Sequence, residues 1–111
     1  MSYVTSVVVV TAYASKALAD AITTPHAFEH DGQPHLDQLR RLDMAGAGGS
    51  KGCGSDVFAA GLNYANRERL RAFMDALPWS DLAVVMVHTE GEMREVWTYG
   101  SEHLDERDGW P

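Results

Sequence analysis

Histidines and carboxylates are concentrated in the first third of the chain, where they could bind a metal ion. His26, His30 and His35 lie close together in sequence, with Glu29 and Asp31 among them. Imidazole and carboxylate groups together suit divalent metals such as Zn and Ni. A hydrophilic surface loop has the same composition, however, and no cysteine or regular ligand spacing reinforces the cluster. The loop interpretation is therefore favoured, with no cofactor expected and a Zn or Ni site as the alternative.

The start of this segment also fits a catalytic motif. His26-Ala27-Phe28-Glu29-His30 matches the H-x-x-E-H pattern of inverted zinc metallopeptidases, in which one helix presents both histidines. Pro25 precedes the motif and Gly32 and Pro34 follow it, so barely one helical turn fits between them. Because the chemistry requires a rigid helix, we interpret the match as coincidence.

A glycine-rich stretch from Gly46 to Gly54 contains two further reactive groups. Its backbone amides and Lys51 could bind an anion, and Cys53 could act as a nucleophile with a histidine as base. A phosphate-binding loop requires Gly-Lys-Ser/Thr, whereas Ser50 precedes the lysine here and Gly52 follows it. The pattern therefore favours a flexible connector.

Aromatic and arginine side chains accumulate in the second half of the chain. Trp97 and Tyr99 share one face of a predicted edge strand, and Trp79 lies upstream of them. If no helix covers that face, these amphipathic rings form a binding surface. If a helix covers it, the rings complete the core, which is the favoured interpretation. Arg67 and Arg71 lie one helical turn apart and could clamp an anion, although a solvated helix face also explains them.

The charge balance restricts the classes of partner. The chain has 111 residues and a formal net charge of −7, from 16 acidic and 9 basic residues. This charge repels phosphate backbones and anionic lipids, so it argues against nucleic-acid and membrane-surface binding and favours a cationic partner.

A single cysteine excludes an internal disulfide, and the apolar run at residues 7–10 lacks the preceding basic residues of a signal peptide. We therefore expect a cytoplasmic protein.

The strands that must position these residues follow from hydrophobic periodicity. Residues 3–13 and 82–89 are nearly continuous apolar runs, which are typical of interior strands covered on both faces. Residues 56–64 alternate large and small side chains as a third strand. Residues 94–99 form a fourth, and Glu90-Gly91 marks the hairpin turn before it.

Helices are predicted between these strands. The first begins after Ser15, which can cap it, and the last begins after Asn66 and ends before Pro78. The leucine spacing of residues 36–42 predicts another helix. The result is an α+β two-layer sandwich, with a mixed sheet of about four strands and two or three helices mainly on one face, ferredoxin-like or related. Residues 1–100 form this single domain, followed by an acidic tail over residues 101–111 that we expect to be flexible.

The middle of the chain resembles a group of known proteins. The succession Asp56-Val57-Phe58-Ala59-Ala60-Gly61-Leu62-Asn63-Tyr64, then a helix ending Leu77-Pro78-Trp79, then an apolar strand, is similar to small uncharacterised α+β proteins of actinobacteria and their phages. The resemblance implies an α+β fold and no activity.

The candidate groups do not combine into a catalytic centre, because no nucleophile, base and orienting group occur at a spacing that exceeds chance. We therefore predict a small non-catalytic protein-binding or regulatory module, similar to an inhibitor or immunity protein, that uses acidic and aromatic surface. The alternative is a small metal-binding protein or enzyme that uses the segment from His26 to His35. A homodimer formed through an uncovered sheet edge is compatible with both. The candidate binding residues are Trp79, Trp97, Tyr99, Lys51, Arg67 and Arg71, and the candidate metal ligands are His26, His30 and His35.

Overall fold

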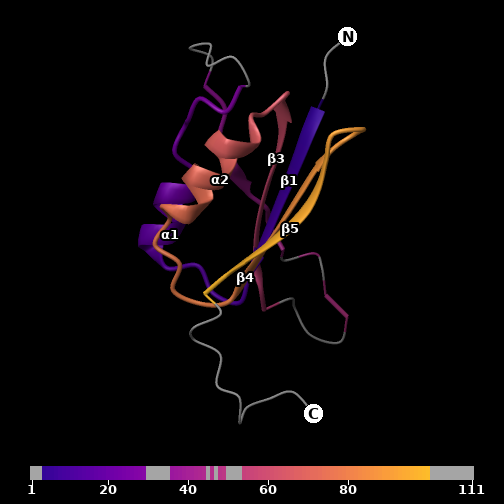
Figure 1. Ribbon diagram of the computed structural model, residues 1–111. Coiled ribbons are helices and arrows are strands. Elements are labelled where there is room, and N and C mark those ends of the chain that lie inside the picture. The colour runs from indigo at the N-terminus through magenta and orange to yellow at the C-terminus, as the bar shows by residue number, and fades with distance from the viewer. Residues whose placement is uncertain (1–3, 30–35, 45, 47, 50–53, 101–111) are drawn as a thin grey trace.

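One antiparallel sheet and a layer of helices make up the described part of the chain. The computed structural model describes residues 4–29, 36–44, 46, 48, 49 and 54–100 (Figure 1). The predictions for His30, His35, Lys51, Cys53 and the tail at residues 101–111 lie outside the described residues. In chain order the elements are β1 (Val4–Thr11), α1 (Lys16–Ile22), β2 (Arg40–Arg41), β3 (Asp56–Asn63), α2 (Arg67–Asp75), β4 (Ala83–Thr89) and β5 (Met93–Tyr99).

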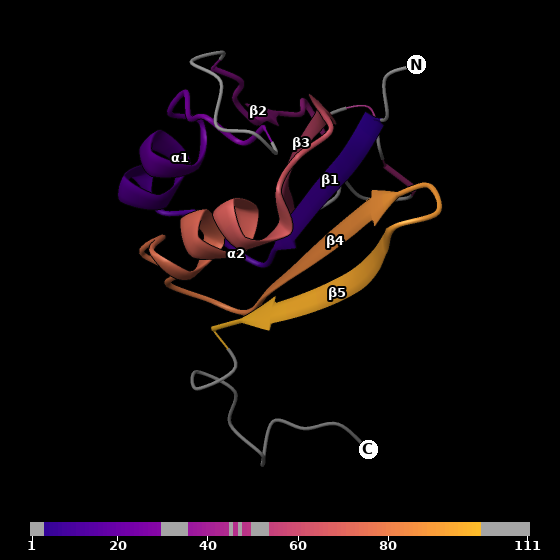
Figure 2. The same ribbon diagram turned by 45° about the horizontal axis from the view of Figure 1, so that its top comes forward.

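The five strands lie in the order β2-β3-β1-β4-β5, so that β1 is at the centre and β5 is at one edge. Every pairing between neighbouring strands is antiparallel. Both helices lie against the same face of the sheet (Figure 2), and no helix covers the other face in the described part of the chain. The predicted α+β class and the placement of the helices on one face are confirmed. The predictions of a mixed sheet and of about four strands are wrong.

The helix predicted over residues 36–42 does not form. The backbone of Asp37 pairs in both directions with that of His26 (2.8 and 3.0 Å), and the two residues of β2 pair with β3. Of the three leucines on which the prediction rested, Leu39 is fully buried, whereas the other two are exposed. The segment is extended because neighbouring strands satisfy its backbone groups. The wrong number of strands has the same cause, because residues 40–41 form β2, the antiparallel neighbour of β3, and not part of a helix.

The two remaining helices begin where their capping residues predict. The Ser15 hydroxyl accepts a hydrogen bond from the amide of Leu18 (3.1 Å) at the start of α1. The Asn66 side chain accepts one from the amide of Arg69 (3.0 Å) at the start of α2. Each cap satisfies an amide that has no partner inside its helix.

The core lies between the sheet and the helices. Val7 and Val9 of β1 and Val85 and Val87 of β4 alternate with residues that point to the opposite face. Because helices cover one face only in the described part, the prediction that these interior strands are covered on both faces is wrong. The other fully buried large side chains are Phe28, Phe58, Leu18, Ile22, Leu39, Leu62, Leu70 and Met74.

Buried threonines hold the ends of the central strand. The hydroxyl groups of Thr5 in β1 and Thr89 in β4 form a hydrogen bond of 2.7 Å. The Thr5 oxygen also accepts a hydrogen bond from the backbone amide of Ala65 (3.1 Å), which ties the segment before α2 to the sheet. At the other end of β1, the Thr11 hydroxyl donates to the carbonyl of Leu82 (2.9 Å). These bonds satisfy polar groups that the fold removes from water.

Candidate functional site

The sheet face opposite the helices exposes a group of large apolar side chains. We call this surface the open face. Its large exposed side chains, between 40% and 65% accessible, are Val4, Val10, Val84, Met86 and Val96. They come from β1, β4 and β5, which lie side by side in the sheet (Figure 2). An exposed apolar cluster of this kind commonly marks an interaction site.

Strand register places the members of the open face next to one another. Val10 lies opposite Val84, and Met86 lies between Val8 of β1 and Val96 of β5. Side chains directly opposite on neighbouring strands are within contact distance on the same face of the sheet. Val10, Val84, Met86 and Val96 therefore form one continuous patch, whereas Val4 lies beyond the polar row that contains Ser6 and His88. Sequence analysis missed this patch because it assumed that both faces of β1 and β4 were covered.

Five of the six predicted binding residues converge on the opposite side, where α2 packs against β5. The Arg71 guanidinium lies 4.9 Å from the ring centre of Trp97 and 5.4 Å from that of Tyr99. The Arg67 guanidinium lies 5.8 Å from the Trp97 ring. Trp79 stacks on Tyr99 with ring centres 4.8 Å apart and an interplanar angle of 13°. We call these five residues the aromatic–arginine cluster.

The polar groups of this cluster are engaged within the protein. Arg67 donates two hydrogen bonds to Glu95 (2.6 and 2.7 Å). These hydrogen bonds between opposite charges lower the pKa of Glu95 and raise that of Arg67. Burial, followed by the hydrogen bond that Tyr99 donates to Asp75 (2.7 Å), raises the pKa of Tyr99. The indole of Trp79 donates to the carbonyl of Met74 (2.8 Å).

These contacts give the cluster a structural role. Trp97 is only 5% exposed, and the rings close the core where α2 meets the edge strand β5. Cation–π contacts and stacked rings of this kind stabilise the packing of a helix on a sheet. The helix cover favours the core interpretation of Trp97 and Tyr99. The binding role of these residues stays a prediction.

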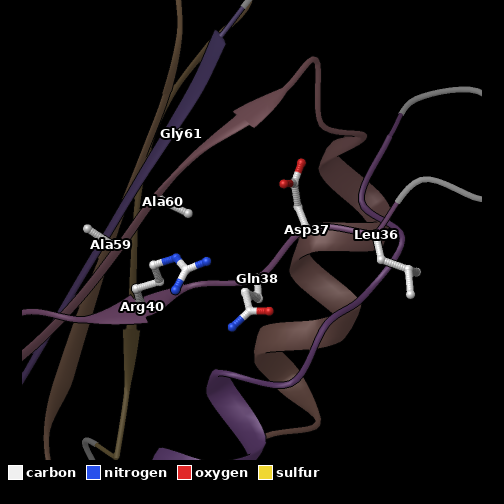
Figure 3. A pocket seen from close by; sticks show the side chains of 7 residues that line it. All are labelled: Leu36, Asp37, Gln38, Arg40, Ala59, Ala60 and Gly61. Atoms are coloured by element: carbon white, nitrogen blue, oxygen red, sulfur yellow. The ribbon is translucent and has the colours of Figure 1, made fainter.

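A shallow cleft opens where β2 stops pairing with β3. It has a volume of about 300 Å³ and is lined by Leu36, Asp37, Gln38, Arg40, Ala59, Ala60 and Gly61. Figure 3 shows segment 36–40 diverging from β3, with the small side chain of Ala60 directed toward the gap. The cleft offers one carboxylate, one amide and one guanidinium, a set that could hold a polar ligand but contains no nucleophile. Sequence analysis missed it because it predicted a helix there.

The only candidate metal ligand within the described residues is His26. Its ring packs against Phe28 and Phe73, with ring centres 4.9 and 5.0 Å away. No group of three or more histidine, cysteine, aspartate or glutamate side chains with metal-binding geometry occurs in the described ranges. The convergence of His26 with His30 and His35 on a metal ion stays the alternative to the favoured surface loop, since the latter two histidines lie outside those ranges.

No protein-family model, curated protein or solved structure matches this chain. The resemblance of its middle part to actinobacterial and phage proteins therefore stays a prediction. Within the part of the chain that the structure describes, no helix is both long enough and apolar enough to cross a membrane.

Proposed function

We propose that this chain is a small non-catalytic protein-binding module whose contact surface is the open face. The observation that carries the proposal is that the central strands β1 and β4 are apolar on both faces while helices cover only one face in the described part of the chain. A sheet with one solvated face normally alternates apolar and polar side chains along its strands. The apolar second face is therefore explained by a second protein surface that covers it.

The exposed fractions of these side chains indicate how much free energy a partner would gain by covering them. The five large side chains of the open face leave about 350 Å² of apolar surface in water, which corresponds to roughly 9 kcal/mol when it is fully covered. Association itself costs about 4–15 kcal/mol in lost freedom, so one patch supports binding when the partner contributes a matching apolar surface. The proposal therefore requires an apolar partner surface of similar size.

Several finer expectations belong to the same proposal. An inhibitor-like or immunity-like role in the cytoplasm agrees with a small acidic domain that binds a protein. A cationic partner would contact the acidic surface outside the open face. The succession β1-α1-β2-β3-α2-β4 supports a ferredoxin-like architecture to which β5 has been added, because it follows the βαββαβ order.

Affinity capture with matched variants tests the proposal. Met86→Lys places a charge in the centre of the open face, while Ala72→Lys makes the same change of charge at an exposed position of α2. We expect the wild-type protein and Ala72→Lys to retain the same bound proteins and Met86→Lys to lose them. Equal capture by all three folded proteins would show that the open face is not the contact surface.

The metal-binding alternative has a direct test in the native protein. Metal content is measured after purification without chelator or affinity tag, and the melting temperature is recorded with and without added Zn or Ni. A metal ion that binds the folded state raises the melting temperature. A metal-free protein whose melting temperature ignores both ions would exclude a role for residues 26–35 in binding Zn or Ni.

A further inference from the structure

We infer that a second copy of this chain covers the open face, so that two sheets stack face to face between two outer layers of helices. The inference rests on the proposed function, because it takes the open face as the contact surface and names its occupant. Stacked sheets pack about 10 Å apart with interdigitating side chains. Three properties of the face support a second copy: its side-chain pattern, its charge and its size.

The pattern is that of an aliphatic patch with a polar row along one side. Two largely apolar rows cross the sheet, one formed by Val57, Val10, Val84 and Thr98 and the other by Ala59, Val8, Met86 and Val96, with Arg40 of β2 beside Ala59. Val57 is only 8% exposed, so the accessible part of the first row lies on β1, β4 and β5. The next row consists of Gly61, Ser6, His88 and Arg94. Aliphatic side chains have no hydrogen-bonding groups to leave unsatisfied, so an aliphatic patch fits a copy of itself across a two-fold axis.

The charge distribution also favours this face for self-association. The chain has a net charge of −7, so two copies repel each other over most orientations. No carboxylate belongs to the strand positions of the open face. Its arginines, Arg40 of β2 and Arg94 of β5, lie at the two opposite edges of the sheet. Two copies that meet at this face therefore place neutral surface against neutral surface at the centre.

The size of the face is close to the lower limit for a specific interface. Strands β3, β1, β4 and β5 contain seven or eight residues each. At about 3.3 Å per residue and about 4.8 Å between strands, they cover a planar area of roughly 450 Å². Two copies bury about 900 Å², near the ~1,000 Å² expected of a specific interface, and the projecting side chains add to this area. We expect a reversible dimer rather than an obligate one.

Two other occupants fit the face less well. A strongly acidic partner would be attracted to Arg40 and Arg94, which have no ion-pair partner among the described residues. Arg94 lies outside the two apolar rows and Arg40 lies at the β2 end of one of them, so a partner held by these arginines would leave the aliphatic side chains of β1, β4 and β5 unused. Residues 101–111 of the same chain offer only Leu104 and Trp110 as large apolar side chains, against five exposed on the face.

Sedimentation equilibrium of the full chain tests the inference at increasing protein concentration. We expect the mass to rise from that of one chain toward that of two. The dimer should be stronger in about 500 mM than in about 50 mM salt, because salt screens the repulsion between two acidic copies. Val96→Lys should weaken it at least about 100-fold, since each dimer contains the change twice. Ala72→Lys alters the net charge equally but lies on α2, and should leave dimerisation unchanged.

The outcomes separate the inference from the proposed function. Val96 is 65% exposed, so Val96→Lys should keep the wild-type melting temperature at low protein concentration, where both proteins are monomeric. A dimer unaffected by this folded variant, or one weakened by salt, would overturn the inference. A monomer that becomes dimeric on Trp110→Ala would instead identify the chain's own tail as the occupant. A monomeric wild type that still captures another protein through Met86 would refute dimerisation and leave the proposed function standing. A monomer without capture through Met86 would refute both proposals.

Discussion

Replacement of Thr5 by valine should destabilise the protein through two buried polar groups. Valine has the same shape as threonine but neither donates nor accepts a hydrogen bond. The Thr5 hydroxyl bonds with that of Thr89 (2.7 Å) and accepts from the amide of Ala65 (3.1 Å), and all three residues are buried. Each group left unsatisfied costs about 1–3 kcal/mol. We therefore expect Thr5→Val to lower the free energy of unfolding by about 2–4 kcal/mol.

A double-mutant cycle separates the two bonds. Thr89→Val removes only the hydrogen bond between the two hydroxyl groups and leaves the bond from the Ala65 amide to Thr5 in place, so it should cost about 1–2 kcal/mol. The double variant leaves only the amide of Ala65 without a partner. Its destabilisation should therefore be smaller than the sum of the two single effects by at least about 1 kcal/mol, because the Thr5–Thr89 bond is lost in both single variants.

Equilibrium unfolding in urea, followed by circular dichroism at low protein concentration, measures these differences. The matched control is Thr98→Val, the same chemical change at an exposed position of β5, which should alter stability by less than about 0.5 kcal/mol. If Thr5→Val changes stability no more than this control, or if the two single effects add in the double variant, the network does not stabilise the fold as we describe.

Two further predictions concern a glycine and an ion pair. Gly100 has a φ of +72°, and a Cβ there would lie 2.1 Å from the carbonyl oxygen of Asp81. Gly100→Ala should therefore destabilise the protein by at least about 1 kcal/mol more than Gly91→Ala, which has a φ of +78° but open space, in the same urea assay. The pKa of Glu95 lies below its ordinary value of 4.5 because Arg67 donates to it, so its stabilisation is complete above that value and is lost as pH falls through the lowered pKa. The melting temperature of Glu95→Gln should be below wild type at neutral pH and converge with it in acid, and a difference independent of pH would contradict this assignment.

Local sequence signals determined most of the secondary structure. The caps at Ser15 and Asn66 identified the starts of both helices, and Glu90-Gly91 identified the hairpin turn before β5. Each of these signals acts over a few residues, because a cap or a positive φ depends on the immediate neighbours. The apolar runs likewise identified β1 and β4 as interior strands of the sheet.

The tertiary structure decided which surfaces meet. Leucine spacing alone predicted a helix at residues 36–42, but backbone pairing with His26 and with β3 made the segment extended. The convergence of Arg71, Trp97 and Tyr99 required α2 to pack on β5, and no local pattern specifies that packing. The apolar character of both faces of β1 was legible in the four valines at residues 7–10. Only the arrangement of the helices showed that one face is left open, because cover depends on elements distant in sequence.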